Sequence, residues 1–346
     1  MKSHTVPKRL LRQFAYPEGT TGTDRLWRFE KDRSPYSKAS PDRATRVEGH
    51  FADPNDSEIE AAIERRLAYE IEDPVNQFIA RFCDPTFVMT EEQQLKMSRY
   101  VTLLFNRSIA RRNATKHLLE IRNSALESFL SKDWQLATVA AHWNIDAFYK
   151  GLNFGRLLTT ENVKNAARRY VVESTSGREA QEWYAQGTLR AIAGIDEALL
   201  GGEWRLLPAP MGEVFMLSDS PVVTWRRLAS GKINYGVGFH TVDVEVLLPL
   251  SPKTCVHILP RVQRTGTAII PTVTEINIAQ ASFAHSACFA NQNSQEMDKI
   301  VQRYISSVKP GQNAFTVFHR NYDNTIYQIL MSGGRWVPPL GADESA

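Results

Sequence analysis

The hydrophobic pattern of this chain changes its period at Gly201 and Gly202. Before these glycines, apolar residues recur at helical spacing, as in the i+4 stripe that runs from Ile59 to Ile71. After them, short apolar runs are separated by Pro and Gly, a pattern that is typical of strands. We therefore predict an α+β fold in which a helix-rich N-terminal two-thirds packs on a mainly antiparallel C-terminal sheet.

Three stretches are expected, packed as one compact unit. Residues 1–55 form an extended segment, with a short strand at Leu26–Phe29 and a loop from Ser34 to Ala44. Residues 56–200 form a helical region, and residues 201–346 form an α+β region.

Individual elements follow from local signals. A first helix begins after the cluster Asp53–Ser57 and ends near Asp84, and a second begins at the capping box Thr90–Gln93 and reaches about Leu130. Further helices are expected at 133–149, 160–173, 177–199, 274–290 and 295–307. Strands are expected at 204–207, 214–217, 222–225, 244–248, 255–259, 315–319 and 326–331.

Composition excludes several classes of protein. With 41 basic and 38 acidic side chains the net charge is +3, too small to indicate a nucleic-acid-binding protein by itself. The three cysteines form no CxxC pair, which gives no signal for a zinc site or a disulfide framework. The basic N-terminus lacks the apolar run of a signal peptide, and no segment approaches the roughly 20 apolar residues that cross a bilayer. We expect a soluble, cytoplasmic protein with no membrane partner.

Charged residues at apolar positions point to a site. On a wheel of about 100° per residue, Glu70 falls inside the stripe of the first helix, Glu60 at its margin and Glu64 just beyond it. On the second helix, Arg107 projects between apolar neighbours and Arg111 follows at i+4 on much the same face. A buried guanidinium needs a carboxylate or a phosphate. Two interpretations stay open: a buried ion pair of the Glu70–Arg107 type, or an arginine pair that grips an anionic ligand.

A third candidate is the segment Ser218–Pro221, where a strand runs into Asp219 before a proline-enforced turn. An aspartate there suits a metal ligand or an Asx turn, and the turn is the simpler explanation. The eight histidines form no HxH, HExxH or HxxxH motif, and no nucleophile elbow, Walker A loop or GxGxxG fingerprint is present.

The N-terminus begins with His4-Thr-Val-Pro7, followed by Leu11 and Phe14. This order resembles the His-x-x-Pro…Leu-x-x-Phe start of a widespread bacterial family, the domain-of-unknown-function family numbered 4238. The later motifs of that family also have counterparts here: Trp27-Arg28-Phe29, Glu64 and Glu70, Arg107 and Arg111, Ser218–Pro221, and Asn277.

The resemblance implies that His4, Glu70, Arg107 and Asp219 converge at one site. The spacing of the helical glutamates departs from the family pattern, so Glu60, Glu64 and Glu70 remain alternatives for that position. The family supplies candidate residues and no reaction.

Convergent histidine, carboxylate and arginine side chains suit hydrolysis or transfer at a phosphate. In this hypothesis His4, Glu70 and Asp219 are catalytic, Arg107, Arg111 and Asn277 bind the ligand, and a divalent metal is a candidate cofactor. Basic residues near the N-terminus could contact a nucleic-acid backbone or form a solvated basic face: Lys8, Arg9, Arg12, Arg25, Arg28 and Arg33.

We therefore predict a nucleic-acid-directed hydrolase of the kind used in toxin or phage-defence systems. A non-catalytic module that senses a nucleotide or another anion, or that binds a partner protein, is the alternative. In a third interpretation, the same residues form only a buried polar network.

Overall fold

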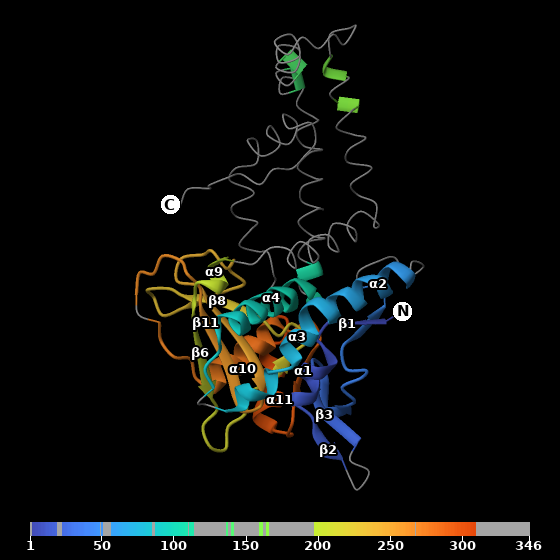
Figure 1. Cartoon of the computed structure of the whole chain (residues 1–346), viewed down its shortest axis with the longest axis vertical. Helices are drawn as coiled ribbons and strands as arrows, with labels where there is room; N and C mark the ends of the chain where they lie inside the picture. The colour runs from blue at the N-terminus through green and yellow to red at the C-terminus, as the bar shows by residue number, and fades with distance from the viewer. Residues whose placement is uncertain are drawn as a thin grey trace. The chain divides into compact units, whose positions relative to one another are not determined.

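The computed structural model describes residues 2–18, 23–48, 50, 57–84, 87–109, 111–113, 197–266 and 268–308, together with a few positions between 136 and 165 (Figure 1). The chain divides into two compact units. Residues 1–114 and 181–310 form the first, and residues 115–180 and 311–346 form the second. Every helix and strand described below belongs to the first unit.

One five-stranded antiparallel sheet has the strand order β6-β11-β10-β8-β9. Its strands are β6 (Glu203–Pro208), β8 (Val223–Arg227), β9 (Ile233–Tyr235), β10 (Glu245–Ser251) and β11 (Thr254–Leu259). Val246 and Val256 pack on one face, whereas their neighbours Leu247 and Cys255 pack on the other. Because both faces are covered, β10 and β11 are buried at every position and nearly continuous in apolar residues.

Helices cover both faces of this sheet (Figure 1). On the Val246 face lie α1 (Lys8–Gln13), α2 (Ser57–Leu67), a π-helical turn (Ala68–Glu72), α3 (Asp73–Asn76), a 3₁₀ turn (Ile79–Cys83), α4 (Glu91–Arg107) and α9 (Glu197–Leu200). On the Leu247 face lies α10 (Val273–Phe283). The predicted capping box of α4 is confirmed. The Thr90 hydroxyl accepts a hydrogen bond from the Gln93 backbone N–H, and the Gln93 side chain accepts one from the Thr90 backbone N–H.

A second sheet joins the two ends of the first unit. Its order is β2-β3-β12-β7, with β4 also paired to β3. The bounds are β2 (Tyr16–Glu18), β3 (Thr23–Glu30), β4 (Arg33–Ala39), β7 (Leu217–Ser218) and β12 (Ala287–Ala290). Helix α11 (Gln295–Tyr304) packs against it, and β1 (Lys2–His4) pairs separately with β5 (Arg46–Glu48).

The predicted partition into an N-terminal helical part and a C-terminal sheet is wrong. Five strands come from the first 48 residues, and β3 pairs directly with β12 near the other end of the unit. The loop expected from Ser34 to Ala44 is strand β4 as far as Ala39. The helix expected over 274–290 ends at Phe283, and 287–290 form β12. These strands exist because they have partners far away in sequence, which local propensity does not reveal.

Other predicted elements fall mostly outside the described residues: the helices at 133–149, 160–173 and 177–199, the continuation of the second helix to about Leu130, and the strands at 315–319 and 326–331. In the described part of the chain, no helix is long and apolar enough to cross a membrane.

Candidate functional site

The N-terminal strand β1 is held against the helices by its pairing with β5. His4 lies opposite Arg46 in the register, and the Thr5 backbone N–H donates to the carbonyl of Thr45 at 3.1 Å. Helix α1 follows, and Leu11 within it and Phe14 at its C-cap are fully buried in the core. The Leu-x-x-Phe part of the opening motif therefore anchors the N-terminus, and this anchor fixes the position of His4.

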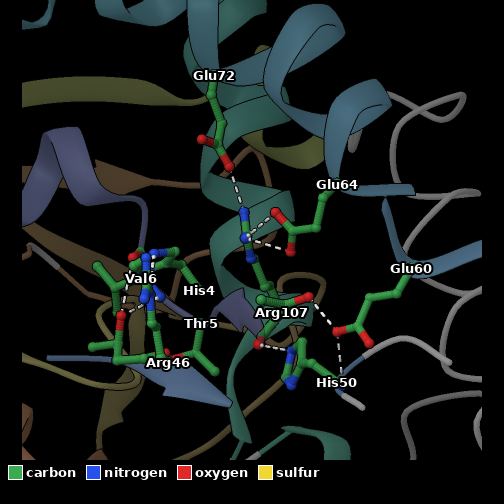
Figure 2. Close-up of polar contacts among 11 residues, drawn as sticks. His4, Thr5, Val6, Arg46, His50, Glu60, Glu64, Glu72 and Arg107 are labelled. Carbon is green, nitrogen blue, oxygen red and sulfur yellow. Dashed lines mark hydrogen bonds and ion pairs between the residues drawn. The ribbon is translucent and has the colours of Figure 1, made fainter. Parts of the chain in front are cut away.

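Arg107, the last residue of α4, is the centre of a buried polar cluster (Figure 2). It is 1% exposed. Its Nη2 donates to both carboxylate oxygens of Glu64, at 2.8 and 2.9 Å, and its Nη1 donates to Glu72. The buried ion pair expected from the sequence is present, but the partners of Arg107 are Glu64 and Glu72. These two carboxylates balance the positive charge of the guanidinium.

Glu70 does not join this cluster. It is exposed and pairs with Arg66 at 2.8 Å on the solvent side of the same helix. The α-helical wheel fails because residues 68–72 form a π-helical turn, which is wider and has hydrogen bonds that span five residues. Ile71 stays in the core, and Glu72, rather than Glu70, is the carboxylate of this turn that reaches Arg107.

A second layer of contacts surrounds Arg107. The Nε2 atom of buried His50 hydrogen-bonds the Arg107 carbonyl at 2.8 Å. The His50 backbone N–H donates to Glu60 Oε1 at 3.1 Å, and the Ser3 hydroxyl donates to the same oxygen. Figure 2 shows His50 and Glu60 on one side of Arg107. The cluster therefore ties β1, residue 50, α2 and the end of α4 together.

Burial and neighbouring charges set the protonation of this cluster. Burial, with the charges of Arg107, Arg46 and Lys8, lowers the pKa of His4 to about 4, so its imidazole is neutral at pH 7. Arg46 Nε donates to His4 Nε2 at 3.4 Å, which places the proton of the neutral ring on Nδ1. Burial also raises the pKa of Glu64; the Glu72 carboxylate adds to this rise and Arg107 opposes it.

Asp219 lies in a different polar network. Its buried carboxylate accepts from the backbone N–H groups of His285 (2.7 Å), Ser286 (2.8 Å) and Ala287 (3.1 Å), and from the Ser286 hydroxyl (2.8 Å). These contacts fix the turn between α10 and β12 onto the end of β7. The carboxylate therefore does not form the local Asx turn expected from the sequence, because its donors lie 66 to 68 residues further along the chain, and its oxygens are engaged with that distant backbone.

Asn277 braces the same region from α10. It accepts from the Met216 backbone N–H at 2.8 Å and donates to the Val214 carbonyl at 3.0 Å. Gln280, which the sequence reasoning missed, accepts from the Ser218 N–H at 2.9 Å and donates to the Pro221 carbonyl at 2.7 Å. A signal was available, since two amides at i and i+3 share one face of an otherwise apolar helix.

Arg111 does not share a helical face with Arg107. Helix α4 ends at Arg107, and Ser108 is extended, with ψ 144°. Because the helix is interrupted there, the i+4 relation is lost, and the Arg111 guanidinium lies 5.4 Å from the centre of the Phe105 ring. Among the residues that the structure describes, no group of three or more His, Cys, Asp and Glu side chains could hold a metal ion. The divalent metal therefore has no candidate ligand set in this part of the chain.

A basic hollow lies at the turn that follows β4. Its volume is about 600 Å³, and it is lined by Arg25, Arg28, Lys38, Ala39, Ser40, Asp42, Arg43 and Ala44. Three nearby carboxylates are each shared by two cations. Glu18 binds Arg25 and Lys38, Glu30 binds Arg28 and Arg33, and Asp42 binds Lys8 and lies 3.9 Å from Arg12. Arg12 lies at the same distance from a fourth carboxylate, Asp24. The exposed Arg43 has no ion-pair partner within the described ranges.

The family model described as "Protein of unknown function (DUF4238)" matches residues 2–294 of the chain. The chain belongs to the DUF4238 family. This membership confirms the family suspected from the sequence. No curated protein and no solved structure matches the chain.

Within this DUF4238 chain, the predicted site residues separate into groups with different partners. His4 contacts Arg46 beside the buried cluster of Arg107, whose charge helps to lower the pKa of the His4 imidazole. Asp219 and Asn277 brace the β7 segment, whereas Glu70 and Arg111 bind neighbours on their own segments. Sequence reasoning did not single out Glu72, His50 or the hollow around Arg43.

Acid is expected to destabilise the protein through His50, because burial and the charge of Arg107 lower its pKa to about 3. In the unfolded chain the same histidine has the ordinary pKa of about 6.5 and is protonated first. The free energy of unfolding therefore falls as the pH drops from about 6.5 toward 3. This histidine alone removes about 2 kcal/mol between pH 7 and pH 5. Urea unfolding of wild type and His50→Gln should show their difference shrinking by that amount, and parallel profiles would contradict the assignment.

Proposed function

We propose that the protein binds nucleic acid, with the phosphate backbone in the basic hollow that follows β4. The observation that carries the proposal is the sharing of carboxylates. Six cations around the hollow rely on Glu18, Asp24, Glu30 and Asp42, and Arg43 adds a seventh charge. Because each carboxylate can neutralise only one cation, a positive excess remains for a polyanion.

Charge along the chain supports the same surface. Residues 1–48 contain eleven Lys and Arg and six Asp and Glu, a net charge of +5. The whole chain carries +3, so the remaining residues carry −2. The modest total therefore hides a basic N-terminal region.

Phosphate chemistry suits the side chains that line the hollow. Three of its four cations are arginines, whose planar guanidinium groups bind phosphate oxygens in pairs. A phosphate near Arg25 and Lys38 would take over one of the contacts that Glu18 now provides to both. Each neutralised phosphate also releases counterions, so affinity falls steeply with salt.

Nucleic-acid binding is the step shared by the narrower functions considered for this chain. A hydrolase in a toxin or phage-defence system and a module that senses a nucleotide both need a phosphate-binding surface. The proposal rests on the hollow rather than on His4, Glu70 and Asp219, because these three residues contact different partners.

Reversing the charge of Arg43 tests the proposal. Arg43→Glu should weaken binding of a labelled oligonucleotide by about tenfold and reduce the slope of log affinity against log salt by about one. Fluorescence anisotropy over a salt series measures both. The same samples, incubated with and without divalent metal, report whether bound nucleic acid is cleaved and whether His4→Ala changes that cleavage.

Lys232→Glu is the matched control, since Lys232 is an exposed cation in the turn between β8 and β9 of the other sheet. It should leave both the affinity and the salt slope near wild type. Equal losses in the two variants would indicate unspecific attraction to the whole molecule, and absence of any binding would end the proposal.

A further inference from the structure

A row of aromatic rings crosses the sheet beside the basic hollow. Tyr16 of β2 and Trp27 of β3 are stacked, with ring centres 5.6 Å apart and planes 14° apart. Tyr36 of β4 meets Trp27 edge-on, with centres 5.2 Å apart. All three side chains are only partly buried. Tyr16 and Trp27 each cover one ring face of the other, and Trp27 and Tyr36 also pack against the core under α11, so the rings are accessible only in part.

Two cations of the hollow also belong to this row. Lys38 lies opposite Trp27 in the register of β3 and β4, and its Nζ is 5.3 Å from the centre of the Trp27 ring. Arg25 lies opposite Tyr16 in the register of β2 and β3. Because both cations also line the hollow, the aromatic row and the phosphate-binding surface are contiguous.

We infer that the nucleic acid bound in the hollow is single-stranded, with an unpaired base stacked on the Tyr16–Trp27 row. The inference rests on the proposed function. In a duplex both faces of each base are covered by neighbouring bases, so a duplex can use the cations of the hollow but not the rings. Aromatic rings interleaved with cations along neighbouring strands suit a single strand, in which base and phosphate bind together.

Substitutions that remove one ring at a time, measured with three ligands, test this inference. Tyr16→Leu and Trp27→Leu keep apolar bulk but remove the stacking surface. Each should weaken binding of a short single strand by about tenfold, leaving the affinity for a duplex of equal length and for inorganic polyphosphate unchanged. Anisotropy competition with DNA and RNA versions measures all three ligands and shows which sugar is preferred. Tyr69→Leu is the control, because this tyrosine is 79% exposed on the π-helical turn and is not part of the row.

The outcomes separate the inference from the proposed function. If wild type binds the single strand and the duplex equally and Tyr16→Leu changes neither, the inference fails while binding in the hollow stands. If Arg43→Glu leaves every affinity unchanged, the hollow itself is excluded and both fall. Trp27 also packs against the β3–α11 core, so Tyr16→Leu decides the test if Trp27→Leu does not fold.

Discussion

Arg107→Met is expected to lower the free energy of unfolding by about 3–5 kcal/mol. The substitution leaves Glu64 and Glu72, which are 17% and 15% exposed, with no cation between them, and an uncompensated, largely buried charge is more costly than the ion pair was favourable. Methionine fills much of the space of the arginine stem, so the loss reports on charge rather than on a cavity. Urea or thermal unfolding at pH 7 measures it.

Two further variants make this prediction specific. Arg66→Met removes the exposed partner of Glu70 on the same helix and should cost less than about 1 kcal/mol. The triple variant Arg107→Met/Glu64→Gln/Glu72→Gln should recover part of the loss, because it removes the stranded carboxylates together with their partner. If Arg66→Met and Arg107→Met were equally destabilising, the burial of the Arg107 cluster would not contribute to its effect on the free energy of unfolding.

Asp219→Asn is the second large effect expected, a loss of about 2–4 kcal/mol. The carboxylate accepts four hydrogen bonds, three of them from consecutive backbone N–H groups, using both oxygens. An asparagine has one acceptor oxygen, and its amide must face at least one buried N–H donor. Hydrogen exchange of the amides of residues 285–287 should accelerate together with the loss of stability.

Asp243→Asn is the matched control. Asp243 also accepts from a backbone N–H and a hydroxyl, both of Thr265, but on an exposed turn. Its backbone is left-handed, with φ 58°, a conformation that asparagine tolerates. We expect a change below about 1 kcal/mol, since water can replace the lost contacts. A small effect at Asp219 as well would mean that its network contributes little to stability.

The sequence was sufficient for features that depend on local signals. The capping box at Thr90 and the strand around Trp27 are confirmed because each rests on neighbouring residues. Arg107 was correctly identified as a side chain that needs an anionic partner. Its charge among apolar neighbours is a local observation, and burial of a guanidinium requires such a partner in any fold.

The rest depends on contacts between distant segments. Strand β12 is a strand because β3 and β7 flank it on both sides, and the sequence Ala-Cys-Phe-Ala does not favour strand over helix strongly enough to show it. Membership of one family placed His4 and Asp219 in the same motif set, but a shared motif set does not imply a shared site. Of the cations that line the hollow, the sequence pointed to Arg25 and Arg28 but not to Lys38 and Arg43, because these residues come from separate segments that only the fold brings together.

The π-helical turn at residues 68–72 also bears on how relatives of this chain should be compared. A π-helical turn holds about one residue more than an α-helical turn, so it acts within the helix as a single-residue insertion. Every position after Ala68 is displaced by one relative to a chain that keeps a regular helix. The counterpart of Glu72 would then lie at a different sequence position in a relative with the same cluster, whereas the counterpart of Glu64, which precedes the turn, would not be displaced.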